Sequence, residues 1–232
     1  MKLTQDDHAR INAAIAAAEH TTTGEITCIL RREQFDYPEV PLGWAAAVAL
    51  ILPLALLPFG ITLDQHMDAL IRLLTQGWTV AHDAANRDAM LAVEAHAALQ
   101  FVLFVATYLI VSLPGVRHVL TPRILRQRRA HQKALELFRV RGLDKTRERT
   151  GVLIFCSLFD HHVEVIADEG IYKKVDKSVW RDAVTMLVAH IKKGKLADGY
   201  IAAISRCGAV LSEHFPARAD NPNESPDILI EL

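Results

Sequence analysis

The order of apolar and polar positions predicts short helices and strands near the start of the chain. After Thr4, a typical helix-capping residue, apolar side chains recur at helical spacing up to about residue 19. Residues 21–24 (TTTG) are typical of a turn. Residues 25–30 (EITCIL) then place Ile26, Cys28 and Leu30 on one face, which predicts a strand.

A second series of elements follows after residue 117. Residues 151–158 (GVLIFCSL) are almost continuously apolar, which is typical of a central strand buried on both faces. A tight turn at 160–162 should connect this strand to an antiparallel partner at 163–167, closed by a turn at 168–170. Periodic spacing predicts three helices, over residues 122–141, 177–192 and 196–214. The segment 218–232, rich in Pro and Asn, is expected to be an extended tail.

Two long runs without Asp, Glu, Lys or Arg, residues 40–63 and 95–116, separate these two series. A helix rises 1.5 Å per residue, so about 22 residues cover about 33 Å, slightly more than a hydrocarbon core. We therefore predict transmembrane helices over 42–63 and 95–115, with prolines kinking the first. The alternative is a pair of buried core helices, which a domain of this size rarely accommodates.

The intervening loop, residues 64–94, contains apolar residues at helical spacing, among them Leu70, Leu73 and Trp78. This pattern predicts a short amphipathic helix at the outer membrane interface, and packing against the two spans is the alternative.

Charge predicts the orientation of these spans. The loop 64–94 is mainly acidic, whereas six basic residues follow the second span before the first acid, Glu136; they are Arg117, Arg123, Arg126, Arg128, Arg129 and Lys133. The positive-inside rule then places both termini in the cytoplasm, in a multi-pass protein of the inner cell membrane. These basic residues, next to the membrane, are expected to meet anionic lipid head groups of the bilayer. Nucleic acid is not an expected partner, because the chain lacks a recognised reading motif.

The domain organisation follows from the number of strands. Neither residues 1–36 nor residues 117–217 contain enough strands for a sheet, so we expect them to fold together, with 37–116 as a membrane hairpin inserted between them. The predicted fold class is α/β, a small mixed sheet flanked by helices.

Composition narrows the function classes. Hydrophobic residues make up 51% of the chain, charged residues 23%, and the formal net charge is -1. The three cysteines are far apart, which excludes a disulfide scaffold and a standard zinc knuckle.

Recognisable catalytic motifs are missing from the sequence: it contains no GxSxG, HExxH, GxGxxG or P-loop pattern. The best local candidate is the acidic pair Asp168 and Glu169 at a strand end, with Asp176 and Asp198 as further candidate ligands. Such carboxylates could hold Ca²⁺ or Mg²⁺, and the alternative is that they cap a turn. A second polar group, Asp160 to Glu164, suggests a metal site or, as the more common arrangement, a polar hairpin.

Three stretches of the sequence resemble the TPM domain family: Thr22, Gly24 and Glu25; the segment RTGVLIF from Arg149; and the segment HVEVIADEGI from His162. The later Asp198-Gly199-Tyr200 also fits. The closest resemblance is to a bacterial membrane branch that carries an inserted hairpin. The resemblance implies a TPM-like fold and metal binding at Asp168. It also implies roles that range from acid phosphatase activity to assembly of membrane complexes.

Two hypotheses follow. The first is a cytoplasmic TPM-like domain on a membrane hairpin, serving as a binding or assembly module for a membrane-protein partner. The second is a divalent-metal-dependent phosphatase that acts near the membrane, with the metal polarising the phosphoryl group. Transport is disfavoured, because two spans without Asp, Glu, Lys or Arg cannot enclose a polar pathway.

Overall fold

The computed structural model describes residues 2–56, 84–218 and 220–232, and these residues form two compact units. Unit 1 comprises residues 1–35 and 123–232, and unit 2 comprises residues 36–122. Each unit is described separately below.

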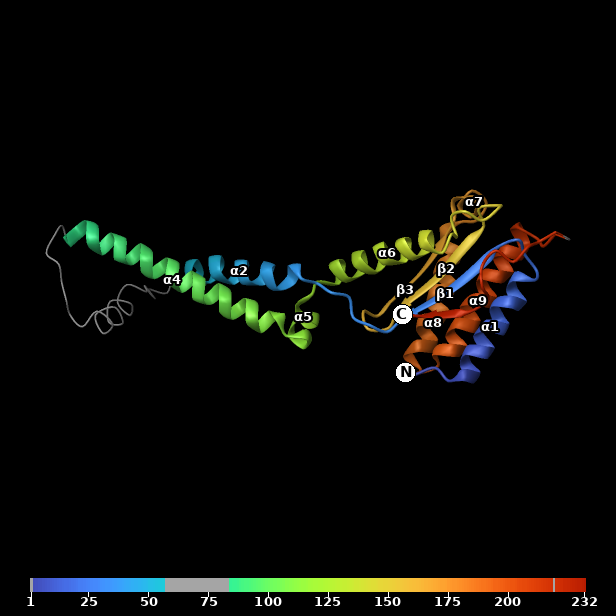
Figure 1. Cartoon of the computed structure of the whole chain (residues 1–232), viewed down its shortest axis with the longest axis horizontal. Helices are drawn as coiled ribbons and strands as arrows, with labels where there is room; N and C mark the ends of the chain where they lie inside the picture. The colour runs from blue at the N-terminus through green and yellow to red at the C-terminus, as the bar shows by residue number, and fades with distance from the viewer. Residues whose placement is uncertain (1, 57–83, 219) are drawn as a thin grey trace. The chain divides into compact units, whose positions relative to one another are not determined.

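Unit 1 is built on one mixed sheet of four strands in the order β3-β2-β1-β4 (Figure 1). The strands are β1 (Glu25–Arg31), β2 (Gly151–Ser157), β3 (His162–Ala167) and β4 (Leu229–Glu231). β1 pairs in parallel with β2, from Glu25↔Gly151 to Arg31↔Ser157, and with β4, whereas β2 and β3 are antiparallel. The expected mixed sheet is therefore present, and its central strand β2 is buried along its whole length.

Helices cover both faces of this sheet, which explains why β2 is apolar on both sides and why β1 is buried over all but its last residue. The helices are α1 (Gln5–Glu19), α6 (Arg123–Val140), α7 (Glu169–Tyr172), α8 (Lys177–Lys192) and α9 (Leu196–His214). α1, α8 and α9 form one layer and enclose the main core with Ile26, Cys28 and Ile154. α6 packs against β2 and β3 on the other face, where Leu153 and Phe155 are fully buried.

Local signals explain where these helices begin and end. The Thr4 side chain accepts a hydrogen bond from the Asp7 amide, and the Asp7 carboxylate accepts one from the Thr4 amide, so α1 starts with a capping box. α6 ends before Gly142, whose φ of 74° is in the left-handed region that glycine tolerates. α8 and α9 have the predicted bounds.

The C-terminal region differs from the sequence prediction. Instead of a wholly extended tail, residues 229–231 form the edge strand β4 on β1. The Leu229 amide donates to the Asn12 side chain, and Arg32 forms an ion pair of 2.7 Å with Glu231. The turn predicted at 168–170 is the start of the short helix α7, with Asp168 as its cap.

Unit 2 consists of α2 (Glu39–Leu56) packed against α4 (Ala84–Ser112), followed by α5 (Pro114–Leu120). The second predicted span is interrupted, since α4 ends at Ser112 and α5 leaves it at 98°. Pro114 explains the break, because the residue before a proline avoids helical geometry, and Leu113 is extended with ψ 130°. The end of the first predicted span and residues 64–83 of the predicted outer loop lie outside the described residues.

A continuous membrane-spanning helix is therefore not found in the described part of the chain. There, no single helix is both long and apolar enough to cross a bilayer. The bent pair His96–Ser112 and Pro114–Leu120 meets the criterion only by length and composition.

Candidate functional site

Asp168 is held by an arginine rather than left open at the strand end. It follows β3 directly, its side chain is only 4% exposed, and its Oδ1 accepts the Glu169 amide at 2.6 Å as the cap of α7. The Arg149 guanidinium reaches both carboxylate oxygens, with Nη2 at 2.9 Å from Oδ1 and Nε at 2.8 Å from Oδ2. The Nη2 contact is a charge-assisted hydrogen bond, and the Nε contact is an ion pair in which Oδ2 accepts no hydrogen bond among the described residues.

The backbone around Arg149 is shaped to make this pair. Arg149 has a φ of 58°, in the left-handed region that non-glycine residues rarely adopt. Gly170 lies so close that an added Cβ would meet the Arg149 carbonyl at 2.5 Å. The hydrogen bond to Asp168, followed by its charge, raises the pKa of Arg149 above its ordinary value. Asp168 thus connects the loop before β2 to the start of α7.

The other predicted ligands have separate roles. Glu169 is exposed and lies 3.5 Å from Lys173. Asp176 caps α8 by accepting the Ser178 amide at 2.7 Å, and these hydrogen bonds lower the pKa of Asp176. Asp198 pairs with Arg10 at 2.6 Å.

These donors do not fit a Ca²⁺ or Mg²⁺ site as they are placed, because the cationic guanidinium of Arg149 lies 2.9 and 2.8 Å from the two oxygens of Asp168. Over the described ranges, no three His, Cys, Asp or Glu side chains are grouped so that they could hold a metal ion. The metal site stays a prediction from the sequence and its resemblance.

His131, which the sequence did not single out, joins the polar residues of the hairpin between β2 and β3. On β3, Glu164 accepts contacts from two imidazoles, His162 Nε2 at 3.2 Å and His131 Nδ1 at 2.6 Å, the latter contributed by α6. Burial raises the pKa of Glu164, but the hydrogen bonds and charges of His162 and His131 outweigh it, so the net shift is downward. His131 and Glu164 are 33 residues apart, so only the packing of α6 on the sheet could reveal this cluster.

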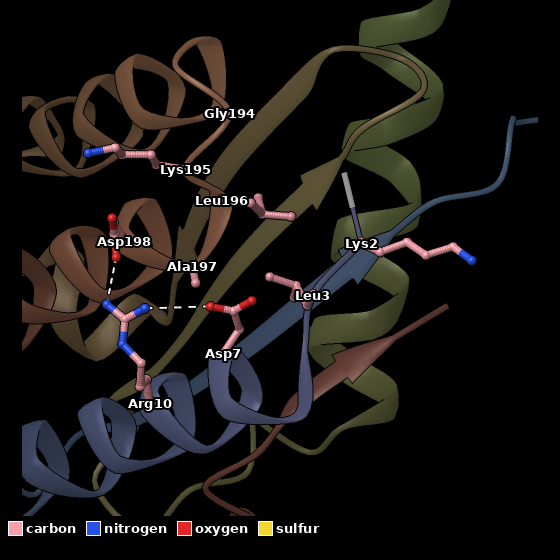
Figure 2. A pocket seen from close by; sticks show the side chains of 9 residues that line it. All are labelled: Lys2, Leu3, Asp7, Arg10, Gly194, Lys195, Leu196, Ala197 and Asp198. Carbon is pink, nitrogen blue, oxygen red and sulfur yellow. Dashed lines mark hydrogen bonds and ion pairs between the residues drawn. The ribbon is translucent and has the colours of Figure 1, made fainter.

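A hollow of about 340 Å³ lies between the first turns of α1 and α9 (Figure 2). The Arg10 guanidinium lies between two carboxylates of the lining, 2.6 Å from Asp198 and 3.5 Å from Asp7. Figure 2 shows Lys2 and Lys195 extending away from each other at opposite sides of the hollow. The positive charge of Arg10 is therefore already balanced by carboxylates of the protein.

Thr22, Gly24 and Glu25, which belong to the motif that resembles the TPM family, form hydrogen bonds at the start of β1 and to the C-terminal segment. The Thr22 hydroxyl donates to the Phe215 carbonyl at 2.6 Å and accepts the Gly24 amide at 3.0 Å. The buried Glu25 carboxylate accepts the amides of Glu224 and Ser225 at 3.2 and 3.0 Å. These contacts give Thr22, Gly24 and Glu25 a structural role.

Five of the six predicted membrane-proximal basic residues belong to α6, whose buried face contains Ala130, Ala134, Leu137 and Phe138. Arg123 and Arg128 are exposed, Arg126 and Arg129 have partners in the fold, and Lys133 pairs with Glu136 at 2.6 Å. The sixth, Arg117, belongs to α5 and lies 3.7 Å from Asp36.

Comparison with known proteins agrees with this architecture. The model of the family described as the TPM domain matches residues 115–210, from α5 to the last turns of α9. The chain is also similar in structure to the BA42 protein from the psychrophilic bacterium Bizionia argentinensis, solved by NMR. That likeness has a TM-score of 0.55 at 17% identity and covers 100% of this chain and 97% of BA42. A search of curated proteins gave no match.

The sequence match covers β2, β3 and α7, next to which Arg149 and Asp168 lie, and the structural match extends the same α/β fold to α1, β1 and β4. Residues 115–210 are therefore similar in sequence to the TPM domain, and the chain shares the α/β fold of BA42.

Proposed function

We propose that unit 2 anchors the protein in a lipid bilayer and that the TPM domain serves there as a binding or assembly module. The observation that supports the anchor is the distribution of buried and exposed side chains on α2 and α4. The buried residues in the middle of α2 are small, Ala45 and Ala49 at 0% and 5% exposure, and Val40 in its first turn is 5% exposed. Large apolar side chains point outward instead, including Ile51 at 63% and Phe101 at 69% exposure.

This distribution is the reverse of a helix pair in water, where large apolar side chains are buried between the helices. In a bilayer, lipid tails solvate leucine and isoleucine, and small residues let the helices approach closely. The described parts of α2 and α4 also lack charged residues between 40 and 56 and between 95 and 112. Acyl chains are therefore the surroundings that suit this surface.

The proposed orientation rests on the basic residues. Arg117 and the arginines of α6 follow the end of the hairpin, and the positive-inside rule then places both termini in the cytoplasm. The TPM domain would meet a membrane-protein partner on that side.

Membrane fractionation of the full-length protein tests the anchor. Because all three native cysteines are buried, a single exposed cysteine introduced by Lys192→Cys reports the side of the membrane selectively. We expect the protein to sediment with membranes after carbonate washing. We also expect an impermeant maleimide to label Lys192→Cys in inverted vesicles but not in intact cells. Recovery in the detergent-free supernatant would overturn the anchor, and labelling in intact cells would overturn the orientation.

The alternative function, a divalent-metal-dependent phosphatase, has no specific contact in its favour, since Asp168 is paired with Arg149. Phosphatase turnover on p-nitrophenyl phosphate, with Mg²⁺ or Ca²⁺ and after chelation, tests it. We expect no metal-dependent turnover. Turnover that disappears in a folded Asp168→Asn variant would replace the binding-module proposal with the enzymatic one.

A further inference from the structure

The short helix α5 is oriented across the direction of α4. The two helices meet at 98°, and the Arg117 amide already bonds to the Leu113 carbonyl at 2.9 Å, so α5 starts immediately after the break. If α4 crosses a bilayer, as the proposed function requires, a helix at about a right angle to it runs along the bilayer surface.

The side chains of α5 suit the boundary between acyl chains and head groups. Val119 is 77% exposed, and Leu113, just before the helix, is 57% exposed. Arg117 and His118 are on the same short helix, which contains no acidic residue. Arg117 Nε is buried and has no acceptor among the described residues, whereas Nη2 of the same side chain lies 3.7 Å from the exposed Asp36. Arg117 and His118 are partly buried, so α5 combines an exposed apolar side chain with basic side chains that reach the surface in part. This combination is typical of an interfacial segment.

Trp44 connects the start of the hairpin to this helix. Its indole Nε1 donates to the Leu120 carbonyl at 3.2 Å, and its side chain is 41% exposed. Tryptophan gathers at membrane interfaces because its ring is apolar and its N–H requires an acceptor. The beginning of α2 and the end of α5 are therefore at the same level of unit 2.

We propose that Trp44, Leu113 and α5 form an interfacial collar that lies in the head-group layer and binds anionic lipid phosphates through Arg117. The proposal rests on the proposed membrane anchor and adds to it a depth and a lipid preference. Charge complementarity supports the anionic lipid, because the next acid in the chain after the collar is Glu136, beyond five further basic residues.

Depth measurements with spin labels test the collar in the full-length protein. Labels are placed at Val119→Cys for the collar, Ile110→Cys for the outward face of α4, and Lys192→Cys for the TPM domain. The buried native cysteines are spared, since burial raises the pKa of Cys156 and of Cys207 to about 12. The protein is reconstituted in vesicles of phosphatidylcholine alone or of equimolar phosphatidylcholine and phosphatidylglycerol. The ratio of collisions with oxygen to collisions with a water-soluble nickel chelate then reports depth.

We expect the ratio at Val119→Cys to be severalfold above that at Lys192→Cys and severalfold below that at Ile110→Cys. In anionic vesicles, Arg117→Gln should shift the Val119→Cys label toward water, whereas the matched change Arg147→Gln in the TPM domain should not.

Each failure has a separate meaning. A water-like ratio at Val119→Cys with a deep Ile110→Cys overturns the collar and leaves the anchor intact, as does a Val119→Cys label as deep as Ile110→Cys. Water-like ratios at all three sites overturn the anchor itself. An Arg117→Gln effect that is absent, or equal in both vesicle types, overturns the binding of anionic lipid.

Discussion

At the residue scale, the pairing of Arg149 with Asp168 changes how the acidic residues at the end of β3 are interpreted. Carboxylates at a strand end suit a cation, and sequence reasoning treated Asp168 as a candidate ligand. The cation that the structure provides is a guanidinium 19 residues away, on a loop whose backbone adopts a rare conformation. The residues next to Asp168 in the sequence do not indicate that Arg149 is its partner.

Replacing Asp168 by alanine should therefore reduce stability. The change removes the cap of α7 and leaves Arg149 without its carboxylate, so the free energy of unfolding should fall by about 1–3 kcal/mol. Asp176→Ala, which removes only a helix cap, is the matched control and should lower the free energy of unfolding by less. Thermal unfolding in detergent measures both, and equal losses would contradict a role for Asp168 beyond capping.

Glu19 makes stability depend on pH. Burial, followed by the neighbouring Asp227 and Glu25, raises its pKa from 4.5 to about 9, against a hydrogen bond from the Ile26 amide that lowers it. A carboxyl whose pKa is higher in the folded state binds its proton more tightly there. Its contribution is complete below about pH 4.5 and is lost as the pH rises toward 9.

Glu19→Gln should remove this dependence, because a glutamine amide donates to Asp227 as the protonated acid does. The wild-type stability should fall relative to the variant by at most about 1.4 kcal/mol per pH unit between about pH 5 and about pH 9. Thermal unfolding of both proteins across this range measures the difference. A difference that does not change with pH would show that Glu19 keeps its ordinary pKa in the fold.

At the element scale, close helix packing depends on a glycine. An added Cβ at Gly208 of α9 would lie 2.8 Å from the Cβ of Ala18 on α1. This approach brings α1 against α9 and completes the layer that covers β1. The helical periodicity of both segments is visible in the sequence, but the point where two helices touch is set by their crossing.

Gly208→Ala should lower the free energy of unfolding by about 1–3 kcal/mol, because the two methyl groups overlap. Ala18→Gly in the same protein should restore part of the loss, since it removes the opposing methyl group. Unfolding midpoints of the two single variants and the double variant give the coupling energy. Strictly additive effects would contradict a direct contact between these positions.

Edge strand β4 shows what periodicity cannot reveal. Three residues are too few for an alternation pattern, and the pairing partners of β4 lie about 200 residues earlier, at Cys28, Ile29 and Leu30. Its position depends on tail contacts such as those of Glu25 and on the ion pair of Arg32 with Glu231.

At the scale of the whole molecule, one sheet is assembled from two distant parts of the chain. β1 precedes unit 2 and β2 follows it, yet the two strands pair in parallel along seven positions. The sequence suggested this union, because neither part alone contains enough strands for a sheet.

Unit 1 should therefore fold without unit 2. A variant in which a flexible Gly/Ser linker replaces residues 37–121 should be soluble and should unfold cooperatively, since both core faces belong to unit 1. Amide exchange of β1 and β2 measures the result, with full-length protein in detergent as the reference. Rapid exchange in β1 alone would contradict this independence.

The sequence by itself determined the helices α1, α6, α8 and α9, the strands β1 to β3, the two apolar runs and the α/β class, because these depend on the periodicity of neighbouring side chains. Only the tertiary structure decided the partners of Asp168, Glu164 and Glu25, the pairing of β4 and the break after Ser112. Those features depend on which distant groups packing brings together, and spacing along the chain contains no record of that geometry.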